Sequence, residues 1–453
     1  MAIADISQGV QTFEDIRIIG ARAQEVMNKY KINAGDAVLV AITPSPTLYG
    51  TLTGLIGLGV KIIVIEPWLS LSRIDHIIQT TKPKAFLTST IGKLWGLRSK
   101  EIRNIAHWIT DKEILRSSYQ EFKVKDVADE HPAFIVFSSG TTGLPKGVLR
   151  THGYLEKLYL VLDSLEEETY QTPDLILFPS VALYHLGTGR GSVLIPRRWS
   201  QKNINKLIKL CQQFRPETVS ASPGFLKKML KMKKLSEFSF LKRVVIGGAL
   251  CDCPILQEAF ASLPHQKFVH IYGSSEAEPV SLIDAKIAVE ESIKRGYFQT
   301  LCLGKIIAPV KTKSKDNVLW VSGPNVAGEY IGEQELNRGI KERDESGVLW
   351  HCMGDRVNFE GELAFYGGRE KQSRLEFEIE QKAYVILGHS KAFLHRTPDQ
   401  KFILVGEEIK SKWNELKQEL PQIDQFIESS IHRDPRHRSR IDRVKSVPKK
   451  YRI

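Results

Sequence analysis

The chain has 453 residues and a formal net charge of +12, and 42% of its residues are hydrophobic. This composition excludes a disordered or fibrous chain, and the length predicts two unequal domains. No window of about 18 residues is continuously apolar, and residues 1–10 lack a signal-peptide pattern, so we expect a cytoplasmic protein without a membrane-spanning helix. The five cysteines form no C-x-x-C pair and are expected to be reduced, packed thiols.

Apolar strands and amphipathic helices alternate along the chain. Helical periodicity predicts helices at 13–30, 47–57, 71–81, 153–169, 203–214 and 224–231. Short apolar runs predict strands at 37–42, 61–65, 85–88, 133–137, 175–178, 218–221, 243–246 and 267–271. This alternation predicts an α/β fold with mostly parallel sheets flanked by helices.

A loop with the chemistry of a phosphate-binding site follows the predicted strand at 133–137. Glycines let the backbone approach an anion, hydroxyls and backbone N–H groups donate hydrogen bonds, and a lysine supplies positive charge. The spacing does not fit the Walker pattern. The candidate residues of this loop are Ser138, Ser139, Gly140, Thr141, Thr142, Gly143 and Lys146.

The segment 138–148, SSGTTGLPKGV, resembles the phosphate-binding signature of the acyl-adenylate-forming enzymes, which include acyl-CoA synthetases, luciferases and peptide-synthetase adenylation domains. The resemblance covers nearly the whole chain. It implies a large AMP-binding domain at 1–370 and a small, shortened, mobile α+β domain at 371–453, joined by a hinge at Lys371. It also implies ATP and Mg²⁺ as cofactors and a small carboxylic acid as substrate.

A second element, Tyr272-Gly273-Ser274-Ser275-Glu276, follows the predicted strand at 267–271. The carboxyl ends of strands are where open α/β sheets bind ligands. The element resembles the family's Y-G-x-T-E pattern, with serine in place of threonine. The resemblance implies that Tyr272 stacks on adenine, Ser275 bonds the α-phosphate and Glu276 holds Mg²⁺, a metal that is bound by one or two carboxylates together with phosphate oxygens.

Three further segments resemble nucleoside-binding elements of the family. Gly247, Gly248 and Ala249 match its adenine-side loop. Asp355 stands where the family has an aspartate that binds both ribose hydroxyls, and Arg369, 14 residues later, stands where an arginine contacts ribose or phosphate. A carboxylate suits a cis-diol and a guanidinium suits phosphate.

His185 stands where acyl-activating members have a residue beside the carboxylate pocket. A lone histidine in an apolar run is also commonly structural, and both interpretations stay open. Near the end of the chain, Arg440 replaces the family's lysine that bridges substrate carboxylate and α-phosphate, while Lys449 or Lys450 is the alternative. Arginine keeps the charge but not the shape of lysine.

The hinge region is about seven residues shorter than the family pattern and lacks the glycine that lines the pantetheine channel in CoA-using relatives. The resemblance is nearest to long-chain acyl-CoA ligases and olefin β-lactone synthetases. We therefore expect ATP-dependent activation of a carboxylic acid of the fatty acid class, followed by transfer to CoA. The alternatives are β-lactone closure of a 3-hydroxy acid without CoA, and a catalytically impaired nucleotide- or acyl-binding homologue.

Much of the positive charge lies in residues 433–453, where nine Lys/Arg face two aspartates. An anionic membrane, nucleic acid or substrate phosphates could balance this charge. Nucleic acid is disfavoured because no binding module accompanies the basic residues. We expect a solvated basic segment beside the active site, with peripheral membrane contact as the alternative.

Overall fold

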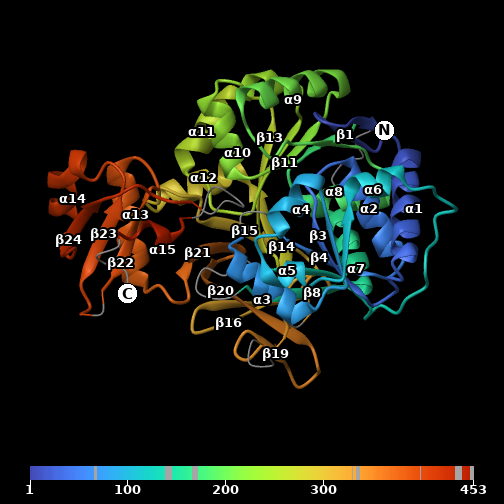
Figure 1. Ribbon diagram of the computed structural model, residues 1–453. Coiled ribbons are helices and arrows are strands. Elements are labelled where there is room, and N and C mark those ends of the chain that lie inside the picture. Colours follow the sequence, from blue (N-terminus) through green and yellow to red (C-terminus); the bar gives the residue numbers. More distant parts are fainter. Residues whose placement is uncertain are drawn as a thin grey trace. The chain divides into compact units, whose positions relative to one another are not determined.

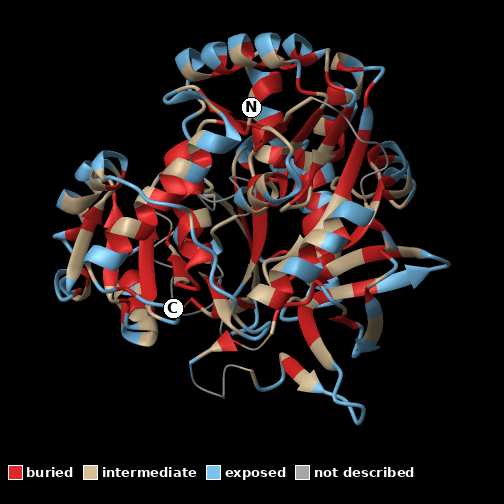
Figure 2. Ribbon diagram, turned by 90° about the vertical axis from the view of Figure 1, so that its right-hand side faces the viewer, coloured by how far each residue is buried: buried red, intermediate tan, exposed pale blue. Residues whose placement is uncertain are grey.

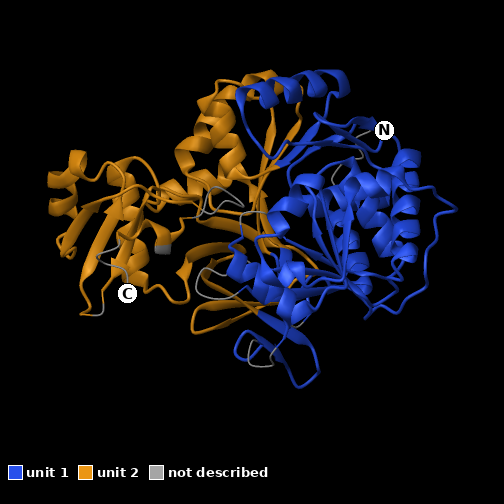
Figure 3. Ribbon diagram, viewed as in Figure 1, with its two compact units in different colours: residues 1–220, 275–278, 322–351 blue, residues 221–274, 279–321, 352–453 orange. Residues whose placement is uncertain are grey.

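The computed structural model describes the chain except for residues 66–68, 138–144, 166–171, 329, 333–336, 398, 434–440 and 449–453. Two compact units are present (Figure 3). Unit 1 comprises residues 1–220, 275–278 and 322–351, and unit 2 comprises residues 221–274, 279–321 and 352–453. Of the described helices, none has the length and apolar character needed to cross a membrane.

A seven-stranded sheet forms the centre of unit 1. Its order is β18 (Tyr330–Ile331), β8 (Gly147–Thr151), β7 (Pro132–Phe137), β4 (Lys61–Val64), β3 (Ala37–Ala41), β5 (Ala85–Thr88) and β6 (His107–Thr110). The strands from β7 to β6 are parallel, as the βα alternation predicts, whereas β8 and β18 are antiparallel. The central strands are mostly buried (Figure 2), which explains their continuous apolar sequences.

A second set of strands in unit 1 pairs in the order β11 (Thr218–Ala221), β9 (Asp174–Ile176), β10 (Ser192–Leu194), β1 (Ile3–Asp5) and β2 (Gly9–Gln11). All pairs are parallel except β1 with β2. The two amino-terminal strands and β10 are too short to give a period-2 pattern, so sequence reasoning missed them.

Helices surround the strands of unit 1 (Figure 1). They are α1 (Phe13–Lys29), α2 (Pro46–Gly57), α3 (Leu71–Thr81), α4 (Thr90–Gly96), α5 (Lys100–Arg103), α6 (Asp111–Arg116), α7 (His152–Ser164), α8 (Pro179–Thr188) and α9 (Gln201–Phe214). The prediction of a helix at 153–169 is confirmed as far as Ser164, and residues 166–171 lie outside the described part. Helices α4, α5 and α6 were missed because four to seven residues give too little periodicity.

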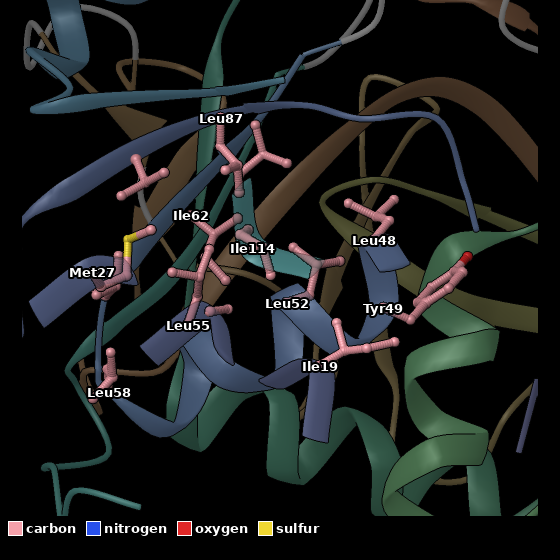
Figure 4. Packing of buried hydrophobic residues seen from close by; sticks show 14 of the residues in the cluster. Ile19, Met27, Leu48, Tyr49, Leu52, Leu55, Leu58, Ile62, Leu87 and Ile114 are labelled. Carbon is pink, nitrogen blue, oxygen red and sulfur yellow. The ribbon is translucent and has the colours of Figure 1, made fainter. Parts of the chain in front are cut away.

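The close packing of α1 against α2 builds the main core of unit 1. A capping box between Thr12 and Asp15 fixes the start of α1. A Cβ on Gly50 would lie 2.7 Å from the side chain of Ile19, so glycine permits the close approach of α2. The buried side chains interlock as Figure 4 shows, with Met27, Leu52 and Leu55 among them.

Unit 2 contains a mixed set of strands. These are β12 (Arg243–Ile246), β13 (Lys267–Ser274), β14 (Ala277–Asp284), β15 (Cys302–Ile306), β21 (Leu363–Arg369), β20 (Leu349–Glu360), β17 (Val318–Ser322) and β16 (Lys311–Lys315). The β12–β13 pair is parallel, whereas β14–β15, β15–β21 and β20–β21 are antiparallel. The accompanying helices are α10 (Pro223–Lys231), η1 (Leu235–Phe238), α11 (Cys253–Ser262) and α12 (Ala285–Lys294). The first residues of β20 lie in unit 1, where they pair with β19 (Lys341–Arg343).

The last part of unit 2 has its own three-stranded sheet, ordered β22 (Ala392–Arg396), β23 (Phe402–Gly406) and β24 (Gln425–Glu428). The helical segments here are α13 (Arg374–Leu387), η3 (Lys410–Lys412), α14 (Trp413–Glu419) and α15 (Arg443–Ser446). Ile379 of α13 is buried in one apolar cluster with Leu404 and Leu416. The α+β character agrees with the expectation, and the domain boundary at 370/371 stays a prediction.

Candidate functional site

The strand pair β7–β8 frames the predicted phosphate loop. Phe137 pairs with Gly147 in antiparallel register, so the chain leaves β7 and re-enters β8 beside it. Lys146 immediately precedes β8. A Cβ on Gly147 would lie 2.6 Å from Ile331 of β18, which explains the glycine in this tight arrangement. The predicted loop residues Ser138, Ser139, Gly140, Thr141, Thr142 and Gly143 lie outside the described residues, and their roles stay predictions.

Lys146 and Glu276 meet at the side chain of Tyr330. The Lys146 ammonium lies 5.4 Å from the centre of the Tyr330 ring, within the range of a cation–π contact. The Tyr330 hydroxyl donates a hydrogen bond of 2.8 Å to Oε1 of Glu276. Tyr330 itself is fixed by the pairing of β18 with Val148 of β8. One aromatic side chain thus links the predicted phosphate lysine to the predicted metal carboxylate.

A second lysine adds positive charge beside Tyr330. Lys341 is buried, lies 5.8 Å from the ring centre and donates to the Ala327 carbonyl at 2.6 Å. His351 pairs with Lys341 across β19 and β20. Burial, followed by the cations Lys341 and Lys146, holds the pKa of His351 well below its ordinary value. The histidine is therefore neutral near pH 7, and the local charge comes from the two lysines.

Arg150 of β8 holds the segment that contains Ser275 and Glu276. Its side chain is buried, and one guanidinium nitrogen donates to the Ser275 carbonyl at 2.6 Å and to Oε1 of Glu278 at 2.8 Å. Its guanidinium also lies over the Tyr154 ring at 5.5 Å. Although burial opposes its charge, nearby Tyr154, Glu278 and Glu276 raise the pKa of Arg150, so the group stays cationic. The strand that follows the phosphate loop therefore positions Ser275 and Glu276 directly.

In unit 2 the structure brings together Tyr272, Asp355 and Arg369. The Tyr272 hydroxyl donates to Oδ2 of Asp355 at 2.7 Å, and an Arg369 guanidinium nitrogen lies 2.8 Å from Oδ1. Asp355 and Arg369 are register partners across β20 and β21. Asp355 is buried, whereas the Arg369 side chain is half exposed. Burial and the Asp355 charge raise the pKa of Tyr272 well above its ordinary value, so its phenol keeps the donated proton.

The predicted adenine-side loop follows β12 directly. The Gly247 N–H donates to the Ala221 carbonyl at 3.2 Å, and Gly248 has φ 84°, a left-handed conformation that favours glycine. In the neighbouring parallel strand, Gly273 and Ser274 end β13. The roles of Gly247, Gly248, Ala249, Gly273 and Ser274 in adenine binding stay predictions.

His270, next to this loop in β13, is a buried histidine that favours the neutral form. Burial lowers its pKa to about 4, although a backbone hydrogen bond involving Ala249 opposes the shift. The unfolded chain binds a proton below a pKa of about 6.5, whereas the folded chain does not bind one until about pH 4, so acid favours unfolding in this interval. At about pH 5, His270 should cost about 2 kcal/mol of the stability present at pH 7. Urea unfolding of the wild type and His270→Gln over this range should show a smaller acid loss in the variant; equal losses would contradict the assignment.

The structure places His185 in a buried polar group within unit 1. Its Nδ1 lies 3.0 Å from the Ser192 hydroxyl and its Nε2 lies 3.4 Å from Asp174, which also pairs with Arg190 at 3.1 Å. Burial, followed by the Arg190 charge, lowers the pKa of His185 to about 3. Such enclosure is typical of a structural histidine, and the role beside a carboxylate pocket stays a prediction.

The remaining predicted residues concern the carboxyl-terminal part. Lys371 is exposed in the turn between β21 and α13, and its role as a hinge stays a prediction. Arg440, Lys449 and Lys450 lie outside the described residues. So do most of the basic side chains from 434 onwards, and the membrane alternative for this segment stays a prediction.

In the cluster of Lys146, Tyr330 and Glu276, one described carboxylate, that of Glu276, is available to bind a magnesium ion. Within the described residues, no group of three His, Cys, Asp or Glu side chains could hold a metal by itself. Glu276 nevertheless fits Mg²⁺, because this ion commonly binds one or two carboxylates and completes its shell with substrate phosphates and water. The hydrogen bond from Tyr330 engages Oε1 of that carboxylate.

Sequence reasoning missed Arg150, Glu278, Tyr330 and Lys341 as site residues. Arg150 and Glu278 did carry a signal, since each is a charged residue two positions beyond a predicted motif, 138–148 and 272–276 respectively. Tyr330 and Lys341 carried none, because their importance depends on the pairing of β18 with β8 and of β19 with β20.

The model of the family described as "AMP-binding enzyme" matches residues 11–331, and the chain belongs to this family. The prediction of an AMP-binding enzyme with a large α/β domain is thereby confirmed.

Among proteins of known function, the chain is similar to 4-coumarate–CoA ligase-like 9 of Arabidopsis thaliana, with 26% identity over 85% of this chain and 71% of the relative. It is also similar to the olefin β-lactone synthetase of Stenotrophomonas maltophilia, with 24% identity over 80% of this chain and 73% of the relative. Among solved structures, the o-succinylbenzoate coenzyme A synthetase of Bacillus subtilis in complex with AMP shares the fold. The TM-score is 0.78 and the identity 18%, over 96% of this chain and 93% of the other.

Proposed function

We propose that this protein uses ATP to convert a carboxylic acid, of the fatty acid class, into an acyl adenylate with release of pyrophosphate. The observation that carries the proposal is the contiguous group of Lys146, Tyr330 and Glu276, fixed to the phosphate-loop strands. Membership of the AMP-binding family supports ATP as the substrate. The basic and acidic groups of this cluster suit phosphates together with a divalent cation.

In the proposed reaction, a carboxylate oxygen attacks the α-phosphorus of ATP. The new P–O bond replaces the bond to pyrophosphate, which leaves with its electron pair, so no proton transfer is required. Lys146 stabilises the charge of the phosphates, and Arg150 keeps Ser275 and Glu276 in place. Glu276 would hold Mg²⁺, whose charge would offset that of the phosphates. Positioning and charge stabilisation supply most of the acceleration in such a step.

The acyl acceptor separates two versions of this function. The first is CoA, which appears in the names of the Arabidopsis and Bacillus proteins. The second is the 3-hydroxyl of the acid itself, which would close a β-lactone and release AMP. The short connection from Arg369 at the end of β21 to Arg374 at the start of α13 favours the second, since it lacks the glycine expected for a pantetheine channel.

The test measures ATP–pyrophosphate exchange over a panel of fatty and 3-hydroxy fatty acids. We expect exchange with at least one acid. AMP release from a 3-hydroxy acid without CoA would select the β-lactone version, whereas an acyl-CoA product from simple acids would select CoA. ATP binding without exchange on any acid would overturn the proposal and leave a non-catalytic binding protein.

Asp355→Asn should weaken ATP binding with little change in the fold. The substitution keeps the side-chain shape but removes the charged acceptor proposed for the ribose hydroxyls. Hydrogen bonds to charged groups contribute about 1.5–3 kcal/mol, so we expect the Kd for ATP to rise by roughly tenfold or more. Calorimetric titration measures this change. Tyr272→Phe removes the 2.7 Å bond to Asp355 and is the control for indirect effects; unchanged ATP binding in Asp355→Asn would remove Asp355 from the ribose site.

If Arg440 has taken the role of the family's lysine, Arg440→Ala should abolish acyl-adenylate formation, while Arg440→Lys should retain it because lysine keeps the charge. Single-turnover formation of the adenylate measures both variants. Loss of activity on truncation after Val447, combined with an active Arg440→Ala variant, would instead assign the role to Lys449 or Lys450.

A further inference from the structure

Helix α4 presents an exposed apolar row. Ile91, Leu94 and Leu97 have exposed fractions of 79%, 69% and 53%. Ile91 and Leu94 lie three positions apart in α4, and Leu97 follows three positions later as the cap residue, with helical φ and ψ. Positions three apart lie on the same side of a helix, so neighbouring members of this row are adjacent. Helix α4 is labelled in Figure 1. Exposed apolar residues scattered singly need no explanation, but an aligned row of aliphatic side chains indicates a binding surface.

The opposite side of α4 is fixed to the core of unit 1. The Ser89 hydroxyl caps the helix by accepting from the Gly92 N–H at 3.1 Å. Trp95 packs against the buried cluster that contains Phe86, and a Cβ on Gly96 would lie 2.9 Å from the Phe86 ring. The apolar row is therefore presented by a helix that is held in place.

Exposed positive charges follow the apolar row directly. Arg98, Lys100 and Arg103 are exposed. Across the described ranges of the chain, no carboxylate forms an ion pair with any of these three side chains. The acidic residue among them, Glu101, accepts a hydrogen bond from Gln79 at 3.3 Å. The aliphatic side chains could enter an apolar layer, while the neighbouring cations could contact negative charges at its surface.

We propose that α4 and the basic segment 98–103 dock the protein reversibly on an anionic lipid surface. Shallow insertion of a few aliphatic side chains, aided by basic residues, is the usual physical basis of such binding. A second copy of the same surface would bring like charges together. Stable protein interfaces also need about 20–30 residues a side, far more than this row supplies. The residues of this surface are not those of the basic segment 433–453, and the proposal does not depend on the proposed reaction.

The structure allows a selective probe of this contact. All five native cysteines are buried, so a cysteine introduced by Leu94→Cys can be labelled selectively with an environment-sensitive dye. Leu160→Cys on α7 is the matched control, because Leu160 is also exposed, at 64%. Vesicles of phosphatidylcholine, with and without phosphatidylserine, are then added. We expect a blue shift for the label at 94 with the anionic vesicles and none for the label at 160.

Vesicle co-sedimentation measures the strength of binding. Ile91→Ser with Leu94→Ser should reduce the partition coefficient about tenfold or more, and Arg98→Ser or Lys100→Ser about fivefold each. Leu160→Ser and Lys206→Ser, at exposed positions of α7 and α9, should have no such effect. Absence of wild-type binding, equal binding by the α4 variants, or no preference for anionic vesicles would overturn the proposal. Self-association that Leu94→Ser abolishes would assign the surface to a second copy instead, and retention by an acidic protein but not by vesicles would assign it to a protein partner.

Discussion

Lys146→Ala should lower ATP–pyrophosphate exchange by roughly 10²- to 10³-fold, equivalent to about 2.7–4 kcal/mol of transition-state stabilisation. The ammonium group lies beside Tyr330 at the entry to β8, where the proposed phosphates would be bound. The charge matters most when the pyrophosphate leaves, because negative charge then develops on its oxygens. We therefore expect a lower kcat as well as a higher KM for ATP.

The same change should leave thermal unfolding almost unaltered. Lys146 is partly exposed, and Lys341, on the same Tyr330 ring, keeps its own bond to the Ala327 carbonyl. Lys157→Ala, an exposed change on α7, is the matched control and should exchange normally. Normal exchange in Lys146→Ala would remove this lysine from the mechanism.

Arg150→Met should reduce both exchange and stability. The variant leaves the Ser275 carbonyl and the Glu278 carboxylate without their common donor. Removing one partner of a buried ion pair costs about 3–5 kcal/mol, and the partly exposed Glu278 should lower this to about 2–3 kcal/mol. Because Ser275 and Glu276 lose their support, we expect kcat to fall and the Mg²⁺ concentration at half-maximal activity to rise.

A control distinguishes positioning from general destabilisation. Lys84 likewise donates to both a carboxylate, Asp36 at 2.9 Å, and a backbone carbonyl, Lys31 at 2.8 Å, within the same unit. Lys84→Met should lower the unfolding temperature but leave the Mg²⁺ concentration at half-maximal activity unchanged. Arg150→Lys should restore part of the activity, since it keeps a cation and a donor. An unaltered Mg²⁺ requirement in Arg150→Met, with activity lost only in proportion to unfolded protein, would show that the residue is merely structural.

The family and much of the architecture could be predicted from contiguous sequence. A phosphate loop depends on successive backbone N–H groups, glycines and hydroxyls. Residues adjacent in the sequence supply all of these groups, so a short segment is enough to identify them. Buried parallel strands are likewise short continuous apolar runs, as at Val38 to Val40 and Ile62 to Val64. These local requirements explain why residues 138–148, the strand alternation and the Y-G-x-S-E element were informative.

Contacts between distant residues were decided by the tertiary structure alone. Arg150 reaches Ser275 across 125 positions, Tyr330 reaches Glu276 across 54, and Tyr272 reaches Asp355 across 83. Each contact depends on strand register, because a shift of one residue turns a side chain to the opposite face of a sheet. The sequence by itself therefore indicated the local motifs of the candidate site, such as Lys146 and the segment with Ser275 and Glu276. The tertiary structure decided which partners hold them, since strand pairing and burial fix the direction of each side chain.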